Sequence, residues 1–487
     1  MSRIITNVSS LLAQRVLGQN NQALTKSLER LSTGLRINRG ADDPAGLIAS
    51  ENLRSEKAAI SAAIGNGERA EQVVNIAEGG LTEVSSLLIE LESLVDQTAN
   101  DAGLSSEEKA ANQLQIDSIL QTIDRIANST SFQSTKLLNG TFDYTTSNIT
   151  STELAEVNIN AANIANGAFI GTTVNVQTSA QTAVAFLSAG NGAAAGQLNA
   201  GGNGSITLEV AGNKGVQQFT FTSNAQLTSA ANAVNTFTAA TGVSAAVSGA
   251  IIVLNSSEFG SSQFVSVTEV DGSIGLTADA YSVGGTDSTV KDVGRDAVIN
   301  INGTQATTDG LKARVSSSKL DVEVTISGTL NTDNATSVFQ ITGGGANFQL
   351  SPKLDLAGKV SIGLPSVTTA QLGSNTNGRL SLLAAGGAAN VSNGDVDLAQ
   401  LIVRDVISQV SSLRGRLGAF QTNTVGATIR SLGVALENTS AAESQIRDTD
   451  FANETAELTR SQILVNAATN ALAIANANPQ NVLALLG

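Results

Sequence analysis

Apolar residues follow helical spacing at both ends of the chain and alternate in short runs between them. Residues 1–140 and 400–487 are rich in Leu, Ile, Val and Ala at steps of three and four, which is typical of amphipathic helices. The middle is rich in Thr, Ser, Gly and Asn, and its apolar runs alternate as in half-buried strands. The pattern predicts a mixed α and β protein whose two helical ends pair in space around a β-rich insert.

The end of the chain carries an apolar seam of the coiled-coil kind. Its positions alternate between steps of four and three: Leu464, Ala468, Ala471, Ala475, Asn478, Val482 and Leu485. A second stripe, at Leu458, Val465 and Leu472, widens the apolar face. Alanine dominates the seam, so the helix packs closely but buries little surface by itself.

The start of the chain carries two shorter apolar runs, interrupted by residues 18–21. The runs are Ile4, Val8 and Leu11, followed by Leu24, Leu28, Leu31 and Leu35. Periodicity alone fits an ordinary pair of core helices about equally well. The stripes reach the chain ends, however, where ordinary domains fray. We therefore expect an assembly element that other chains cover, rather than a catalytic pocket.

A break between two helices is marked by residues 40–46. Asp42 or Asp43 is placed to cap a new helix, and Pro44 fits its first turn, where a missing N–H costs nothing. A paired-acid or metal site at the two aspartates is the less favoured alternative, because both directly precede Pro44. Further helices are expected over 47–97, with a kink at Gly79 and Gly80, over 107–127, and from about residue 396.

Small α+β modules are predicted in the middle. Residues 206–210 and 217–221 alternate on either side of a Gly-containing turn, which indicates a hairpin, and residues 227–237 then follow helical spacing. Strands are expected at 251–254 and 264–267. A second, partial copy of this module is expected between residues 298 and 326.

Composition removes several function classes. The 487-residue chain has no cysteine, histidine or tryptophan, so thiol chemistry and the commonest general base and metal ligand are absent. We expect no enzyme activity, cofactor or metal site. A net charge of −15 argues against nucleic-acid binding. No apolar run is long enough to span a membrane, and residues 1–10 lack the apolar region of a secretory signal.

The helical ends resemble those of bacterial flagellin. At the start, residues 31–38 (LSTGLRIN) and 41–47 (ADDPAGL) carry the resemblance. At the end it lies in 414–421 (RGRLGAFQ), 443–451 (ESQIRDTDF), 454–460 (ETAELTR), 462–464 (QIL) and 479–483 (PQNVL). Residues 339–345 (FQITGGG) and 348–350 (FQL) are similar to the strand region that rejoins the helical part.

The resemblance implies a subunit of the extracellular flagellar filament, exported unfolded through the flagellar type III pathway. The terminal helices would form an inner coiled coil, from 1–44 and 450–487. A helical outer core would follow, from 45–150 and 339–449, and the insert of 151–338 would project outward. Expected partners are further copies in a helical homopolymer, the flagellar cap and hook-associated proteins, and an export chaperone on the C-terminal helix.

The resemblance also implies a weak contact with the Toll-like flagellin receptor. Recognised flagellins present an Arg, a Leu and a Glu, and alignment places Glu90, Leu94 and Gln115 at these positions, with one charge reversed and one lost. Two other classes stay open: the hook–filament junction protein, which has related ends, and a secreted coiled-coil adhesin. The ADDPAGL run and the rejoining segment favour flagellin.

Overall fold

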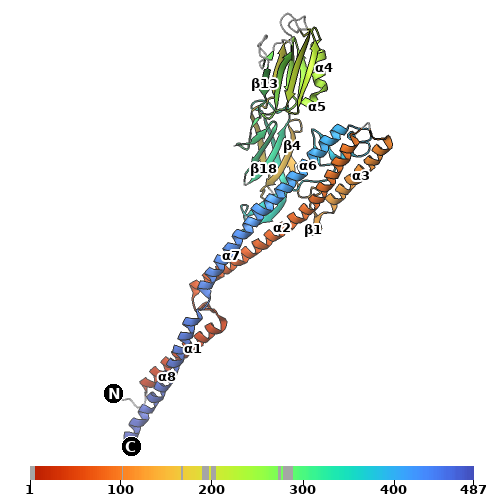
Figure 1. Ribbon diagram of the computed structural model, residues 1–487. Helices are drawn as coiled ribbons and strands as arrows, with labels where there is room; N and C mark the ends of the chain where they lie inside the picture. Colours follow the sequence, from red (N-terminus) through yellow and green to blue (C-terminus); the bar gives the residue numbers. More distant parts are fainter. Residues whose placement is uncertain are drawn as a thin grey trace. The chain divides into compact units, whose positions relative to one another are not determined.

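The computed structural model describes residues 6–486 except 101–102, 166–167, 189–196, 199–203, 272–275, 278–288 and 318. At residues 188 and 276–277 and beyond residue 477 it describes backbone only. The chain divides into two compact units. The terminal unit consists of Met1–Glu71, Gln349–Gly358 and Ala419–Gly487, and the central unit consists of Gln72–Phe348 and Lys359–Gly418. Long helices at both ends and a β-rich middle confirm the predicted mixed fold (Figure 1).

The helices largely follow the apolar periodicity. They are α1 (Val8–Thr33), α2 (Pro44–Thr98), α3 (Ser106–Ser129), α4 (Leu227–Thr236), α5 (Thr238–Thr241), α6 (Val396–Ala419), α7 (Gly426–Arg447) and α8 (Phe451–Leu486), with a 3₁₀ turn at Leu380–Leu383 and a π-helical segment at Phe420–Val425. The expected interruption at residues 18–21 is wrong, because α1 runs through it without a break. Asn20 instead donates from its side chain to the carbonyl of Leu464 (3.3 Å).

Helix α2 is also continuous through Gly79 and Gly80, so these glycines do not end it. At Gly80 a Cβ atom would lie 2.7 Å from Oγ1 of Thr130 and 2.8 Å from Cδ1 of Leu138. These distances are shorter than van der Waals contact. Gly80 is therefore explained by close packing of the helix against the segment that follows α3.

The helical part of the central unit packs α2, α3 and α6 around one apolar core. Leu88, Leu91, Ile116, Ile402 and Val406 are fully buried there. Helix α3 begins with a capping box, in which Ser105 and Glu108 each bond the other's backbone N–H. The chain returning from the insert is fixed to α3 by polar side chains such as Asp124, which accepts the N–H of Thr369 (2.8 Å).

The insert contains two β-sandwiches, one nested in the sequence of the other. The first sandwich has sheets of order β15-β14-β5-β19-β3 and β16-β17-β18-β4, and both sheets supply one apolar core. The second has sheets β12-β6-β10-β9 and β13-β11-β7-β8, and α4 contributes to its core. Its strands β6 to β13 lie in the sequence between β5 and β14 of the first sandwich.

The strands of the first sandwich are β3 (Tyr144–Ser147), β4 (Leu154–Ala162), β5 (Ile170–Thr178), β14 (Val298–Ile301), β15 (Thr304–Gln305), β16 (Thr307–Asp309), β17 (Lys312–Ser316), β18 (Leu320–Ile326) and β19 (Thr336–Gly344). Those of the second are β6 (Val184–Ser188), β7 (Ser205–Gly212), β8 (Val216–Thr222), β9 (Val243–Ser248), β10 (Ile251–Ser256), β11 (Phe264–Asp271), β12 (Leu276–Thr277) and β13 (Thr289–Val293). Three two-stranded pairs complete the sheets: β1 (Ser131–Phe132) with β2 (Thr135–Lys136), β20 (Ala346–Gln349) with β21 (Lys359–Ile362), and β22 (Gly373–Ser374) with β23 (Gly378–Arg379).

The predicted hairpin and helix are present as β7, β8 and α4, with Ile206 paired to Phe221 and Leu208 to Phe219. The expected second copy is wrong. Strands β14 and β18 belong to different sheets, and residues 298–326, described except for 318, contain only strands and turns. Alternation identifies a strand but not the sheet it joins, because that depends on residues far away in the sequence.

Candidate assembly interface

Helices α1 and α8 lie side by side and antiparallel in the terminal unit (Figure 1). Polar contacts fix the register at three levels along the pair. From one end to the other they are Asn7 Nδ2 to the Ala475 carbonyl (2.8 Å), Asn20 Nδ2 to the Leu464 carbonyl (3.3 Å), and the Arg30–Glu454 ion pair (3.4 Å). Helices near the two ends of the chain thus pair with each other, as the sequence predicts.

The faces that the two helices turn to each other follow strict heptad spacing. On α1 the less exposed positions that keep this spacing are Ser10, Ala13, Leu17, Asn20, Leu24, Ser27 and Leu31, and only Glu29 and Arg30 add to them. On α8 they are Glu454, Leu458, Ser461, Val465, Ala468, Leu472 and Ala475, and among the described side chains only Ala477 adds to them. Five of these fourteen side chains are polar, and three more are alanine. Such a seam specifies register but buries little apolar surface, so one helix pair alone is only marginally stable.

The predicted assembly residues fall into two groups around this seam. Leu24, Leu31, Ala468 and Ala475 lie on it. Val8, Leu11, Leu28, Leu464 and Ala471 are exposed and lie off it. Leu35 follows α1 and forms a bridge with Asp448. Ile4 lies outside the described residues, as do the side chains of Val482 and Leu485.

The position of the seam on α8 corrects the sequence analysis. Within one chain the seam runs through the second stripe of Leu458, Val465 and Leu472, and not through Leu464 and Ala471. Ala468 and Ala475 of the first stripe alternate with these longer side chains along the seam.

The paired helices leave apolar surface uncovered. Val8 is 66% exposed and Leu11 59% on α1, and Ile463 is 63% and Ile474 65% exposed on α8. In α7, which the structure describes throughout, not one residue is buried. Burying one such side chain is worth about 1.5–3 kcal/mol. The uncovered faces are therefore a large source of binding free energy for other apolar helices.

The break between α1 and α2 is hydrogen-bonded to the break between α7 and α8. Gly34 ends α1 in the left-handed conformation (φ 74°), which glycine adopts without strain. Its carbonyl accepts from the N–H of Thr449 (2.9 Å), and the N–H of Arg36 donates to the Arg447 carbonyl (2.7 Å). The two helix ends thus hold each other in place. No local sequence pattern predicts these hydrogen bonds, because they join residues more than 400 positions apart.

Asp42, Asp43 and Pro44 lie at the start of α2, where the two acids do different things. Helix α2 begins at Pro44, and Asp43 accepts the N–H of Gly46 (2.9 Å) as a cap. Asp42 instead pairs with Lys26 of α1 (2.9 Å) and accepts the N–H of Arg39 (3.0 Å). The hydrogen bond from Lys26 is the main cause that lowers the pKa of Asp42 from 3.8 to about 2.

Asp42→Asn is expected to lower the thermal midpoint of the terminal unit at pH 7, because the ion pair with Lys26 is lost. A carboxyl whose pKa is lowered by folding stabilises the fold above its unfolded pKa, and this contribution disappears as pH falls through the folded pKa. The difference between parent and variant should thus be full above about pH 4 and vanish near pH 2. Thermal melts followed by circular dichroism at several pH values measure this difference. Glu56→Gln, at an exposed position, is the control. A difference that is independent of pH would contradict this role of Asp42.

The three predicted receptor positions differ in accessibility. Glu90 on α2 and Gln115 on α3 are exposed, whereas Leu94 is only 7% exposed and packs into the core of the central unit. Leu94 therefore offers a partner little surface. Of the three side chains, Glu90 alone is both exposed and charged.

Other kinds of site find little support in the described part of the chain. No helix there is long and apolar enough to cross a membrane. The described residues also contain no group of three or more His, Cys, Asp or Glu side chains placed to hold a metal ion.

Comparison with known proteins finds matches at both helical ends of the chain. Residues 4–143 match the bacterial flagellin N-terminal helical region, and residues 401–486 match the bacterial flagellin C-terminal helical region. Flagellin B of Helicobacter pylori is 29% identical over 538 residues, which cover 99% of each chain. Flagellin B of Vibrio cholerae is 28% identical over 482 residues, which cover 99% of this chain and 98% of its own.

Among solved structures, the flagellar junction protein FlgL of Legionella pneumophila covers 82% of this chain and 99% of its own, at 14% identity and a TM-score of 0.28. A score this low does not establish a shared overall fold. The flagellin matches, in contrast, reach both helical ends and extend over the whole length of the relatives.

The two helical ends pair with each other, and both match helical regions of flagellin. Together with the β-rich insert between them, they define a structural protein of the bacterial flagellum. The chain belongs to the bacterial flagellin family. It is a structural subunit of the flagellar filament, and its place is outside the cell. The prediction of a flagellin is confirmed, and it fits the findings better than the alternative of a hook–filament junction protein.

Proposed function

We propose that α1 and α8 of each subunit are completed by the same helices of neighbouring subunits, so that an inner core forms only in the filament. The observation that carries this proposal is the apolar surface left uncovered on both helices, at Val8, Leu11, Ile463 and Ile474. A marginal helix pair gains little alone and much when neighbours cover its remaining faces. Growth and ordering of the ends are then coupled.

The proposed division of the chain follows from this role. Residues 1–44 and 450–487 form the inner core, 45–150 and 339–449 the helical outer core, and 151–338 the variable insert. The division is supported by the hydrogen-bonded helix breaks at Gly34–Arg36 and Arg447–Thr449, which separate the inner helices from α2 and α7. Contacts that repeat head to tail without closing build a helical polymer.

Before assembly the same uncovered face needs protection. We propose that an export chaperone binds α8, where apolar side chains such as Ile463 and Ile474 are exposed. Export of the unfolded chain through the flagellar type III pathway suits terminal helices that are only marginally stable on their own. The cap and the hook–filament junction would then contact the terminal subunits through the same helices.

Polymerisation of the purified chain tests the proposed function. Monomers mixed with short filament seeds should form long helical filaments, visible by electron microscopy. Short oligomers that stop growing would instead favour the junction protein, and monomers that remain under every seeding condition would contradict the proposal.

Glu90 provides a prediction about immune recognition. The protein should activate the Toll-like flagellin receptor weakly, because an interface built for a cation would meet the exposed Glu90 carboxylate. Glu90→Arg should increase the response in a reporter-cell assay, and Glu90→Gln should increase it less. Full potency of the parent protein would contradict this prediction.

A further inference from the structure

Leu354 stands at the tip of a hairpin with almost no cover. It is 92% exposed, more than any other large apolar side chain among the described residues. The tip follows β20 and precedes β21, and hydrogen bonds within the tip hold its shape. The N–H of Leu350 donates to the Gly358 carbonyl (3.0 Å), and the N–H of Gly358 donates to Oδ1 of Asp355 (2.7 Å). A preformed tip loses little conformational freedom on docking.

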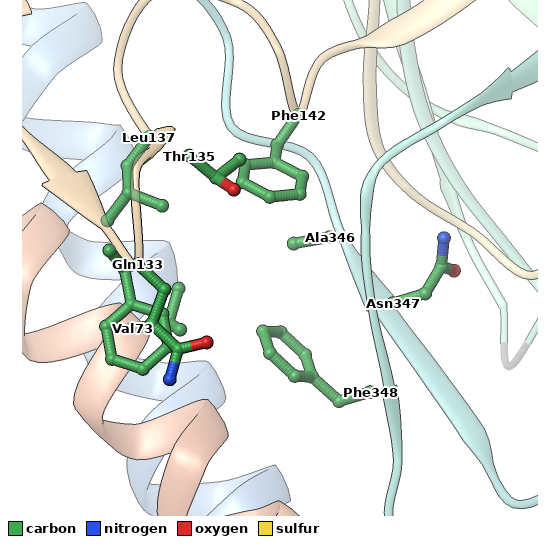
Figure 2. A pocket seen from close by; sticks show the side chains of 9 residues that line it. Val73, Gln133, Thr135, Leu137, Phe142, Ala346, Asn347 and Phe348 are labelled. Atoms are coloured by element: carbon green, nitrogen blue, oxygen red, sulfur yellow. The ribbon is translucent and has the colours of Figure 1, made fainter.

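The central unit contains a small apolar pocket with a volume of about 210 Å³. Its apolar lining consists of Val73, Phe132, Leu137, Phe142, Ala346 and Phe348. Figure 2 shows Phe142, Ala346 and Phe348 across an open centre from Val73 and Leu137. The remaining lining side chains, which the structure also describes, are uncharged and polar.

The size and lining of the pocket suit one apolar side chain better than a small molecule. Sites for small molecules usually measure about 300–1,000 Å³ and include polar groups that fix orientation. In this pocket three phenylalanines make up much of the lining, and the side chain of Leu354 is likewise apolar and uncharged. A protruding apolar residue and a separate apolar pocket on the same chain are the two halves of a contact that repeats from copy to copy without closing.

We propose that Leu354 of one subunit inserts into this pocket of a neighbouring subunit in the filament. The inference rests on the proposed function, because it needs a second copy of the chain as the occupant. That copy is the partner present at every position of a homopolymer. The contact lies outside α1 and α8 and adds a second, separate link between subunits.

Cysteine cross-linking tests the contact, because the parent chain has no cysteine. One variant carries Leu354→Cys, and a second carries Thr135→Cys at the pocket. Filaments grown from an equal mixture are treated with a short bismaleimide and separated on a denaturing gel. A covalent dimer is expected in mixed filaments only, and not in filaments of either variant alone or in the unassembled mixture.

Two further variants measure the energetic role of the same side chain. Leu354→Asp should raise the critical concentration for polymerisation about tenfold or more, because burial of a leucine is replaced by burial of a charge. Leu354→Met keeps an apolar side chain of similar volume and should polymerise like the parent. Both should retain the circular dichroism of the parent, since position 354 is 92% exposed.

The outcomes separate this inference from the proposed function. Mixed filaments without the covalent dimer, or Leu354→Asp filaments that form at the parent concentration, overturn the inference and leave the function intact. If the parent chain forms no filaments, both the inference and the proposed function are contradicted.

Discussion

A chain ending at Arg447 is expected to form no filaments, although its central unit should unfold at the same temperature as in the parent. The truncation removes α8 and leaves the seam residues of α1, such as Leu17 and Leu24, without a partner. The central unit consists of Gln72–Phe348 and Lys359–Gly418, so its own core stays complete. Sedimentation and electron microscopy measure assembly, and calorimetry measures unfolding. Normal filaments from the truncated chain would contradict the assembly role of α8.

A pair of point variants on α8 supplies a finer version of this experiment. Leu472 lies on the seam, whereas Asn470 is exposed two residues away. Leu472→Asp should cost about 1.5–3 kcal/mol of burial in every subunit and suppress growth. Asn470→Asp introduces the same charge off the seam of the single chain. Equal suppression by both variants would show that charge on α8, and not the seam, limits assembly.

Gln113→Ala is expected to destabilise the central unit strongly. The side chain of Gln113 is buried on α3 and joins two points of the returning chain, donating to the Leu383 carbonyl (2.8 Å) and accepting from the Val391 N–H (2.9 Å). Alanine would leave both backbone groups unpaired, at about 1–3 kcal/mol each. The free energy of unfolding in denaturant titrations should fall accordingly.

Gln115 is the matched control for this substitution. It lies on the same helix two residues further on and is exposed. Gln115→Ala should change the free energy of unfolding by no more than about 0.5 kcal/mol. Equal effects of the two alanines would mean that loss of glutamine from α3, and not loss of the bonds to residues 383 and 391, destabilises the unit.

Long, strongly periodic segments of the sequence predicted their elements well. Helices α2, α3 and α6 begin within a few residues of the expected positions, because many apolar residues repeat at one period. The hairpin of β7 and β8 could be predicted equally well, since alternation on both sides of a turn is a local signal. The general kind of site, an uncovered helical surface, also followed from sequence.

The features that the sequence did not reveal depend on distant partners. Helix α8 has two apolar stripes, and in the single chain Val465 of the second stripe is less exposed than Leu464 of the first. The bond between Gly34 and Thr449 joins residues without a shared local motif. Burial of Leu94 follows from packing of the central unit, which alignment with a receptor-binding sequence does not show.

Hydrogen exchange along α8, compared between free subunits and filaments, tests most directly the claim that neighbouring copies complete this helix. The amides of residues 458–475 should exchange rapidly in the free chain, because the pair with α1 is marginal. In filaments they should slow by about ten- to a hundredfold or more, the factor that corresponds to burying one leucine or isoleucine. Strong protection of these amides in the free subunit, or no gain of protection on assembly, would contradict the account.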